Sequence, residues 1–213
     1  MISCFVFITS LLSIYQAHAL NIVIPGGTGP VGRQLSSLLS NCNTPHTVTI
    51  LARNAFLASA PSRVSSDFGW LGSSFLEKHP NVNIRDWDGG DLLEIVGCDW
   101  MGWQDDTLKN ADVVVNLVGG YTEQRVMATE RIVRESLRVN PGALQIAVSP
   151  EEEDLRKFSP GIINVKLKRL QTCEEMVKAN CISSACLRVE MNDINGACEA
   201  ILKAIDEFDE CKS

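Results

Sequence analysis

The sequence predicts an α/β protein in which a doubly wound parallel sheet is covered by helices on both faces. Short apolar runs of strand type alternate along the chain with segments whose apolar residues recur at helical spacing. The strand-like runs are nearly continuous in apolar residues, so both faces of the sheet should be buried. A glycine-rich turn joins the first predicted strand to the first predicted helix. Right-handed crossovers between parallel strands then produce the doubly wound arrangement.

Three strands are predicted in the first half of the chain. Asn21–Pro25 and Thr47–Ala52 are short runs rich in Ile, Val and Thr, and Asn81–Trp87 carries apolar residues at alternate positions. Between the first two strands, Val31–Leu39 has the apolar spacing of a helix. The stretch Ala58–Ser74 is rich in Ser, Ala and Gly and is predicted to be an irregular excursion.

The second half begins with the strongest strand signal of the chain, Ala111–Val118, which reads ADVVVNLV. Strands and helices alternate after it. The predicted elements are a helix at Glu123–Val139, a strand at Leu144–Ser149, a helix at Val165–Ala179, a strand at Ser184–Val189 and a helix at Asn192–Phe208. The acidic run Glu151–Asp154 is predicted to be a solvated loop.

Composition limits the classes of function. The chain has 213 residues, and 19 Lys and Arg against 26 Asp and Glu give a net charge of −7. Hydrophobic residues make up 45% and charged residues 21%, which excludes a disordered or collagen-like chain. A single core can grow to about 250 residues, so residues 20–213 are predicted to form one domain. The acidic balance argues against broad nucleic-acid binding. No Cys-x-x-Cys pair occurs among the eight cysteines, and no metal site is predicted.

Residues 1–19 differ from the rest of the chain. They contain no Asp, Glu, Lys or Arg, their centre is largely apolar, and Ala17-His18-Ala19 fits the small-x-small rule for cleavage. This pattern predicts a cleavable signal that leads into the secretory pathway, or to a plastid through it, and leaves no membrane anchor after cleavage. The alternative is an uncleaved apolar extension packed on the domain, with the protein in the cytoplasm.

The glycine-rich turn Gly26-Gly27-Thr28-Gly29-Pro30-Val31-Gly32 carries the clearest chemistry. Gly26 would allow a tight strand-to-helix turn, Gly29 would let the backbone approach a pyrophosphate, and Gly32 would let the helix pack close to the sheet. The pyrophosphate would then lie at the helix N-terminus, with Thr28, Pro30 and Val31 beside it. The turn therefore predicts dinucleotide binding, and a glycine turn without a ligand is the alternative.

These residues carry a resemblance to a known family. Asn21–Leu39 resembles the N-terminus of extended and atypical short-chain dehydrogenases/reductases, which have a Rossmann fold and a Gly-x-x-Gly-x-x-Gly fingerprint. The run ADVVVNLVGG is similar to the family's fourth strand, which implies that Val118 and Gly119 contact the cofactor. The runs LQIAVS and ACLRV are similar to its fifth and sixth strands, and the former implies a catalytic role for Ser149. The resemblance covers nearly all of residues 20–208 and implies a reductase-like or epimerase-like protein with a nicotinamide cofactor and a small-molecule substrate.

The end of the second strand bears on the choice of cofactor. An acidic residue there would bind the ribose 2′-hydroxyl of NAD, whereas an arginine suits the 2′-phosphate of NADP. The strand ends at Arg53, with Arg33 as a second nearby cation, so NADP is predicted and NAD is the alternative. Asp86 or Asp88 resembles the family position near the adenine, and Asp88 is assigned to the cofactor site.

The resemblance fails at the catalytic positions. Active members of the family use Tyr-x-x-x-Lys on the helix after the fifth strand. Lys168 suits the lysine, which would hold the ribose, but Asn164 then stands where the tyrosine belongs, and an amide cannot act as an acid. A register on Lys166 would place Ile162 there. Tyr121, after the fourth strand, is the remaining candidate acid.

The chain also leaves little room for a substrate domain, because Val189 is followed within a few residues by the last helix. We therefore predict an NADP(H)-binding protein with weak or absent standard catalysis. One alternative is an active NADP-dependent reductase or epimerase with an unusual acid, and another is a non-catalytic scaffold or assembly protein. The oligomeric state is not predicted.

Overall fold

The computed structural model describes residues 18–61, 71–89, 102–158, 160–190 and 192–212. Six strands form one parallel sheet in the order β3-β2-β1-β4-β5-β6, which confirms the doubly wound α/β prediction. The strands are β1 Asn21–Pro25, β2 Thr47–Ala52, β3 Val82–Asp86, β4 Val113–Asn116, β5 Leu144–Pro150 and β6 Ser184–Val189. The targeting signal predicted at residues 1–19 falls almost entirely outside the described residues and stays a prediction.

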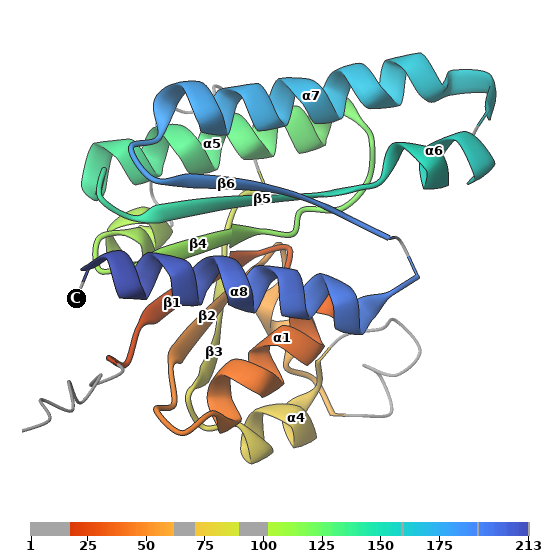
Figure 1. Ribbon diagram of the computed structural model, residues 1–213. Helices are drawn as coiled ribbons and strands as arrows, with labels where there is room; N and C mark the ends of the chain where they lie inside the picture. Colours follow the sequence, from red (N-terminus) through yellow and green to blue (C-terminus); the bar gives the residue numbers. More distant parts are fainter. Residues whose placement is uncertain (1–17, 62–70, 90–101, 159, 191, 213) are drawn as a thin grey trace, which may run out of the picture.

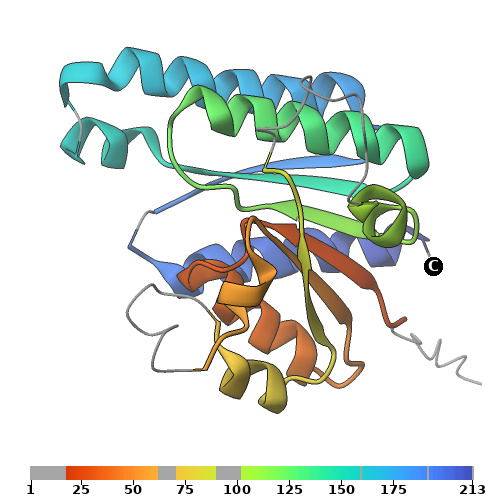
Figure 2. The ribbon, with the colours of Figure 1, turned by 180° about the vertical axis from the view of Figure 1, so that it is seen from behind.

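Helices cover both faces of the sheet. In Figures 1 and 2, α5 and α7 lie side by side over one face, whereas α1 and α8 lie over the other. The longer helices are α1 Pro30–Asn41, α5 Glu123–Val139, α7 Ile163–Asn180 and α8 Ile194–Lys212. The shorter ones are α2 Ala55–Ala58, α4 Ser73–Lys78, α6 Glu152–Phe158, the π-helix η1 Gln104–Leu108 and the 3₁₀ turn η2 Pro160–Ile162. Among these described residues, no helix combines the length and the apolar character needed to cross a membrane.

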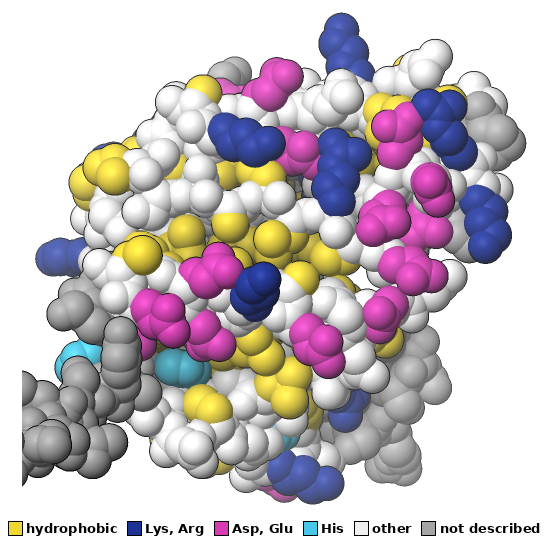
Figure 3. Space-filling view, viewed as in Figure 1, with side chains coloured by type: hydrophobic (Ala, Val, Ile, Leu, Met, Phe, Trp, Pro, Cys, Tyr) yellow, Lys and Arg dark blue, Asp and Glu magenta, His cyan; other side chains and the backbone are white. Residues whose placement is uncertain are grey.

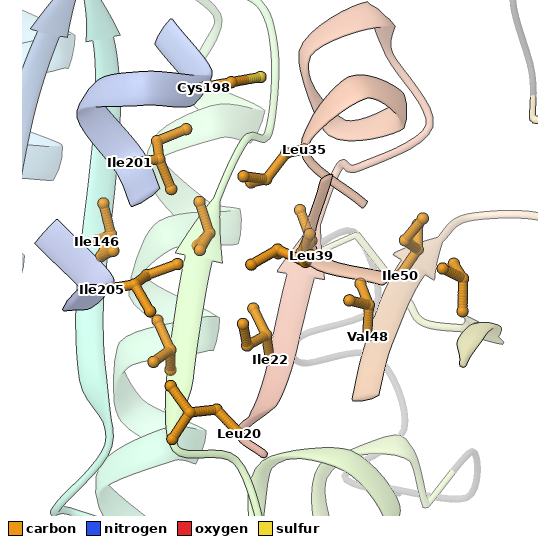
Figure 4. Packing of buried hydrophobic residues seen from close by; sticks show 14 of the residues in the cluster. Leu20, Ile22, Leu35, Leu39, Val48, Ile50, Ile146, Cys198, Ile201 and Ile205 are labelled. Atoms are coloured by element: carbon orange, nitrogen blue, oxygen red, sulfur yellow. The ribbon is translucent and has the colours of Figure 1, made fainter. Parts of the chain in front are cut away.

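The central strand β1 shows why the apolar runs are continuous. Ile22 and Ile24 point to the α1/α8 side, where they pack in one core with Leu35 and Ile201 (Figure 4). Val23 points to the opposite side and belongs to a second core beneath α5. Ile22, Val23 and Ile24 are all at most 2% exposed, so both faces of the sheet are buried, as the sequence predicted.

The structure departs most clearly from the prediction at β4, α6 and α8. The strand predicted at 111–118 is reduced to β4 Val113–Asn116, because the chain leaves the sheet at Val118 and Gly119 and turns toward the glycine-rich turn. The last helix begins at Ile194 rather than at Asn192 and continues to Lys212. The acidic run was expected to be a loop but instead forms the first turn of helix α6. Carboxylates are stabilising there because they interact favourably with the positive end of the helix dipole.

Candidate functional site

The glycine-rich turn has the conformation that its sequence predicts. Gly26 adopts φ +74°, and a Cβ atom there would lie 2.7 Å from the carbonyl oxygen of Leu117. Gly26 therefore allows both the tight turn and the close approach of the chain that follows β4. A Cβ atom at Gly32 would lie 2.2 Å from the carbonyl oxygen of Gly27. The close packing at Gly32 is thus against the turn itself rather than against the sheet.

Gly29 differs from its neighbours because a Cβ atom there would meet nothing within 4 Å. It is the N-cap of α1, and no side chain caps this helix end. The first N–H groups of a helix have no partner within the helix, so these donors can bind an anion. Open space above uncapped N–H groups fits the pyrophosphate of a dinucleotide.

A continuous cleft runs past this turn along the carboxyl ends of the strands. It consists of a hollow of about 280 Å³ and a second one of about 450 Å³. The residues that line both hollows are Gly26, Thr28, Val118, Gly119 and Arg125. The smaller hollow extends to Arg53 and Trp87, and the larger one extends past Gly29, Pro30, Val31 and Gly32 to Ser149 and Val189. In doubly wound sheets this edge is where ligands bind.

The smaller hollow presents a cation, Arg53, and no carboxylate among its described lining residues. Arg53 is exposed and lines the smaller hollow. The Asp86 carboxylate accepts a hydrogen bond from the backbone N–H of Ala55 at 2.6 Å, which ties the end of β3 to α2.

Asp88, assigned to the cofactor site from the sequence, turns away from the cleft. Its carboxylate pairs with Arg131 of α5 at 3.5 Å, and both side chains are only 8% exposed. Its neighbours Trp87 and Gly89 line the smaller hollow instead. The reason is electrostatic, since a buried carboxylate needs a nearby counter-charge and α5 supplies one. Arg33 is likewise drawn aside and lies over the ring of Phe75, 5.2 Å from its centroid.

The structure does not bring Asn164 and Lys168 into the cleft. Both are exposed on α7, and Lys168 lines a shallow groove between α5 and α7, together with Met127 and Val165. Lys166 lies closer, with its Nζ atom 4.6 Å from the ring centroid of Tyr121. Residues two apart on a helix are separated by about 200° around its axis, so the two lysines face different surroundings.

Tyr121 does reach the larger hollow. Burial raises the pKa of its phenol, the charge of Arg125 lowers that pKa, and Asp154 raises it further. Its ring packs beside a small apolar cluster that includes Leu155 and Leu170. The phenol is therefore near the predicted site, but its surroundings make it a weaker acid than a free tyrosine.

Arg125 is not among the site residues predicted from the sequence, although it lines both hollows and is 8% exposed. A signal was present, since Arg125 lies in helical register with the buried Ala128 and Ile132, so a cation interrupts the apolar stripe of α5. Ser149, predicted from the resemblance, lines the larger hollow. It is 1% exposed, and its hydroxyl has no hydrogen-bond partner among the described residues.

Comparison with known proteins adds evidence from structure. No protein-family model matches the chain, and no curated protein matches its sequence. The NADPH-bound carbonyl reductase from chicken fatty liver superposes with a TM-score of 0.61 at 11% identity, over 90% of this chain and 89% of that chain. The UDP-N-acetylglucosamine 4-epimerase from Methanobrevibacter ruminantium M1, in complex with UDP-N-acetylmuramic acid, gives a TM-score of 0.54 at 16% identity, over 81% and 55%.

AtPrR2 with NADP⁺ and (+)-pinoresinol gives a TM-score of 0.52 at 14% identity, over 81% of this chain and 50% of that chain. The present chain therefore spans about half of the length of the epimerase and of AtPrR2. At these identities the likeness shows the fold. The resemblance to short-chain dehydrogenases/reductases is confirmed at that level: the chain has the Rossmann-type sheet of such reductases and epimerases.

Proposed function

We propose that the chain binds a nicotinamide dinucleotide in this cleft, NADP(H) in preference to NAD(H), as a reductase-like or epimerase-like protein whose standard proton transfer is weak or absent. The observation that carries the proposal is the open position at Gly29, above the uncapped start of α1. The pyrophosphate would lie there, and the two parts of the dinucleotide would extend into the two hollows.

The preference for NADP(H) is supported by Arg53 and by the positions of the nearby acids. The guanidinium of Arg53 would hold the ribose 2′-phosphate. A carboxylate that could accept hydrogen bonds from a ribose 2′-hydroxyl is missing from the described lining of the smaller hollow, since Asp86 bonds to Ala55 and Asp88 pairs with Arg131.

Weak standard catalysis is supported by the residues of α7. A bound nicotinamide ring would supply hydride chemistry, but the protein must still provide a proton donor within hydrogen-bond reach of the substrate. Asn164 is exposed and carries an amide, so it meets neither requirement. Loss of such a general acid typically costs about 10²–10⁴ in rate.

An active enzyme is the second candidate, and the position of Tyr121 favours it. This phenol lines the same hollow as Ser149, so both side chains are available to one substrate. Tyr121 would be protonated at neutral pH and could donate to a carbonyl oxygen, but its raised pKa makes it a weaker proton donor than a free tyrosine.

Titration of the purified chain with NADPH and with NADH tests the proposal. Thermal shift should reveal tighter binding of NADPH, and a ligand at 100 times its dissociation constant should stabilise the fold by about 2.7 kcal/mol. Absence of a shift with either dinucleotide at millimolar concentration would overturn it. Turnover of NADPH with a panel of carbonyl compounds at about 1 per second or faster, lost in Tyr121→Phe, would favour the second candidate.

The matched variant is Gly29→Asp. Aspartate is a favoured N-cap residue, and its charge suits a helix N-terminus, so the free energy of unfolding should stay the same or rise. Its carboxylate would occupy the space proposed for the pyrophosphate and repel it. Loss of NADPH binding with an intact fold would support this site, whereas unchanged affinity would place the dinucleotide elsewhere.

A further inference from the structure

Arg125 is a buried cation held at the edge of the sheet. Its Nη2 donates to the carbonyl oxygen of Val148 at 2.7 Å and its Nη1 to that of Gly120 at 3.4 Å. These contacts fix the guanidinium between the ends of β4 and β5, where it lines both hollows of the cleft.

No described carboxylate forms a salt bridge with Arg125, and Glu174, whose charge acts on it, is already paired with Arg188. Arg131, the other arginine with comparable burial, pairs with Asp88 and Glu135, and Arg188 pairs with Glu174. Arg125 donates instead to two neutral carbonyl groups, and no ion pair with it is found in the part of the chain that the structure describes. Buried charges in proteins are normally paired, so an unpaired one that faces a cleft indicates a ligand of opposite charge.

The larger hollow also contains a buried polar group without a hydrogen-bond partner among the described residues. The Ser149 hydroxyl is 1% exposed and has no partner among the described residues, and Ser149 directly follows the Val148 carbonyl that holds Arg125. A buried hydroxyl without a partner is costly unless a ligand or water satisfies it.

The charge of Arg125 is opposite to that of many side chains on the surrounding surface. Asp and Glu side chains are spread over the face that carries α8 and near α6 (Figure 3). Glu190, which lines the larger hollow, is exposed, whereas Arg125 is recessed. An anion would therefore be repelled at much of the surface and attracted inside the cleft.

We infer that Arg125 and Ser149 form an oxyanion subsite that binds a phosphate or carboxylate group of the ligand in this cleft. The group belongs either to the dinucleotide or to a separate anionic substrate, and its oxygens accept from the guanidinium and from the serine hydroxyl. The inference rests on the proposed function in placing the ligand in this cleft, but the subsite itself is testable without a dinucleotide.

Inorganic phosphate is the probe, and thermal shift of the full chain is the readout. Phosphate should raise the unfolding temperature of the wild-type chain above that in sodium chloride of matched ionic strength. Arg125→Met should weaken phosphate binding about ten- to hundred-fold, and Ser149→Ala, which breaks no protein hydrogen bond, about five-fold. General stabilisation by phosphate would be equal in all variants, so it cancels in the comparison.

Two variants keep the test decisive. Should Arg125→Met fail to fold, Arg125→Lys keeps the cation but loses the planar fork, and it should still bind phosphate more weakly than the wild type. Arg134→Met is the matched control on the same helix, because Arg134 is exposed and lines neither hollow, and it should leave the phosphate response intact. The inference is overturned if phosphate gives no shift beyond chloride, or if the response is undiminished in Arg125→Met or disappears in Arg134→Met.

Saturating NADPH then separates the two sources of the anion. A phosphate response that persists beside NADPH assigns the subsite to a separate substrate, whereas a response that NADPH abolishes assigns it to the dinucleotide. Should NADPH fail to bind at all, the proposed function falls while an Arg125-dependent phosphate response still supports the subsite.

Discussion

The two halves of the sheet contribute different kinds of group to the same cleft. In the half formed by β1, β2 and β3, the backbone forms the site: Gly26 makes the turn and Gly29 leaves space above the helix end. In the half formed by β4, β5 and β6, buried side chains form it, with Arg125 and Ser149 as the recessed polar groups. Where the backbone forms the cleft, its conformation restricts which residue types the turn can contain. Where side chains form it, their positions depend on contacts with elements that are distant in the sequence.

Buried polar contacts in the second half show how this dependence works. Asn116 at the end of β4 donates to Thr129 at 3.0 Å, and Gln145 of β5 donates to Ser136 at 2.6 Å. Each pair joins the sheet to α5 and satisfies a polar group that would otherwise be buried at a cost. The face of α5 is therefore polar in places where an apolar stripe alone would be expected.

The largest effect is expected from Gly26→Ala, which tests the backbone half. The positive φ costs about 1–2 kcal/mol for a residue with a Cβ atom, and the contact with Leu117 adds about 1–3 kcal/mol. Gly120→Ala is the control, because Gly120 has φ +83° but open space around it. This variant should therefore lose only the free energy that the positive φ costs. Urea unfolding measures both, and equal losses would contradict the close approach at Gly26.

A smaller loss is expected from Glu174→Gln in the side-chain half. Glu174 accepts two hydrogen bonds from Arg188, at 3.0 and 3.1 Å, and is 8% exposed. Because about a third of the Arg188 side chain is exposed, the loss should be about 1–2 kcal/mol rather than that of a fully buried pair. The exposed neighbour Glu175→Gln should change stability by less than about 0.5 kcal/mol. Similar results for the two variants would show that the pair is not a structural link.

The free energy of unfolding should depend on pH through His46, which holds the backbone just before β1. The Nδ1 atom of His46 accepts a hydrogen bond from the backbone N–H of Leu20 at 3.0 Å, and burial lowers the pKa of His46 despite the opposing charges of Asp209 and Asp206. Because the unfolded chain binds the proton more tightly, stability should be complete above pH about 6.5 and decrease as pH falls through the folded pKa. Urea unfolding between neutral and mildly acidic pH measures this slope, which His46→Gln should reduce. An unchanged slope in the variant would assign it to other groups.

The smallest effect is expected from Lys168→Ala. The sequence assigned Lys168 to the ribose, but the structure places it on an exposed groove, so NADPH affinity should change by no more than about two-fold. Calorimetry on this variant, with Gly29→Asp as the positive control for lost binding, decides between the two assignments. A ten-fold loss in Lys168→Ala would restore the sequence-based one.

The sequence by itself determined the order of strands and helices and the position of the glycine-rich turn. Apolar periodicity and glycine spacing are local signals, and they constrain the backbone directly, so β1, α1 and Gly26 lie where the pattern predicts. The ends of elements were less well predicted. Whether an acidic run such as that in α6 becomes a helix depends on tertiary packing, here on the burial of Leu155.

Only the tertiary structure decided which side chains face the cleft. The rotation of α7 turns Lys168 outward and sets Lys166 beside Tyr121, a difference that depends on how the helix packs against α5 and α6. Asp88 pairs with Arg131, whereas Arg125 donates to neutral carbonyl groups at the edge of the cleft. These outcomes depend on charges that are distant in sequence and adjacent in space, and no local pattern records them.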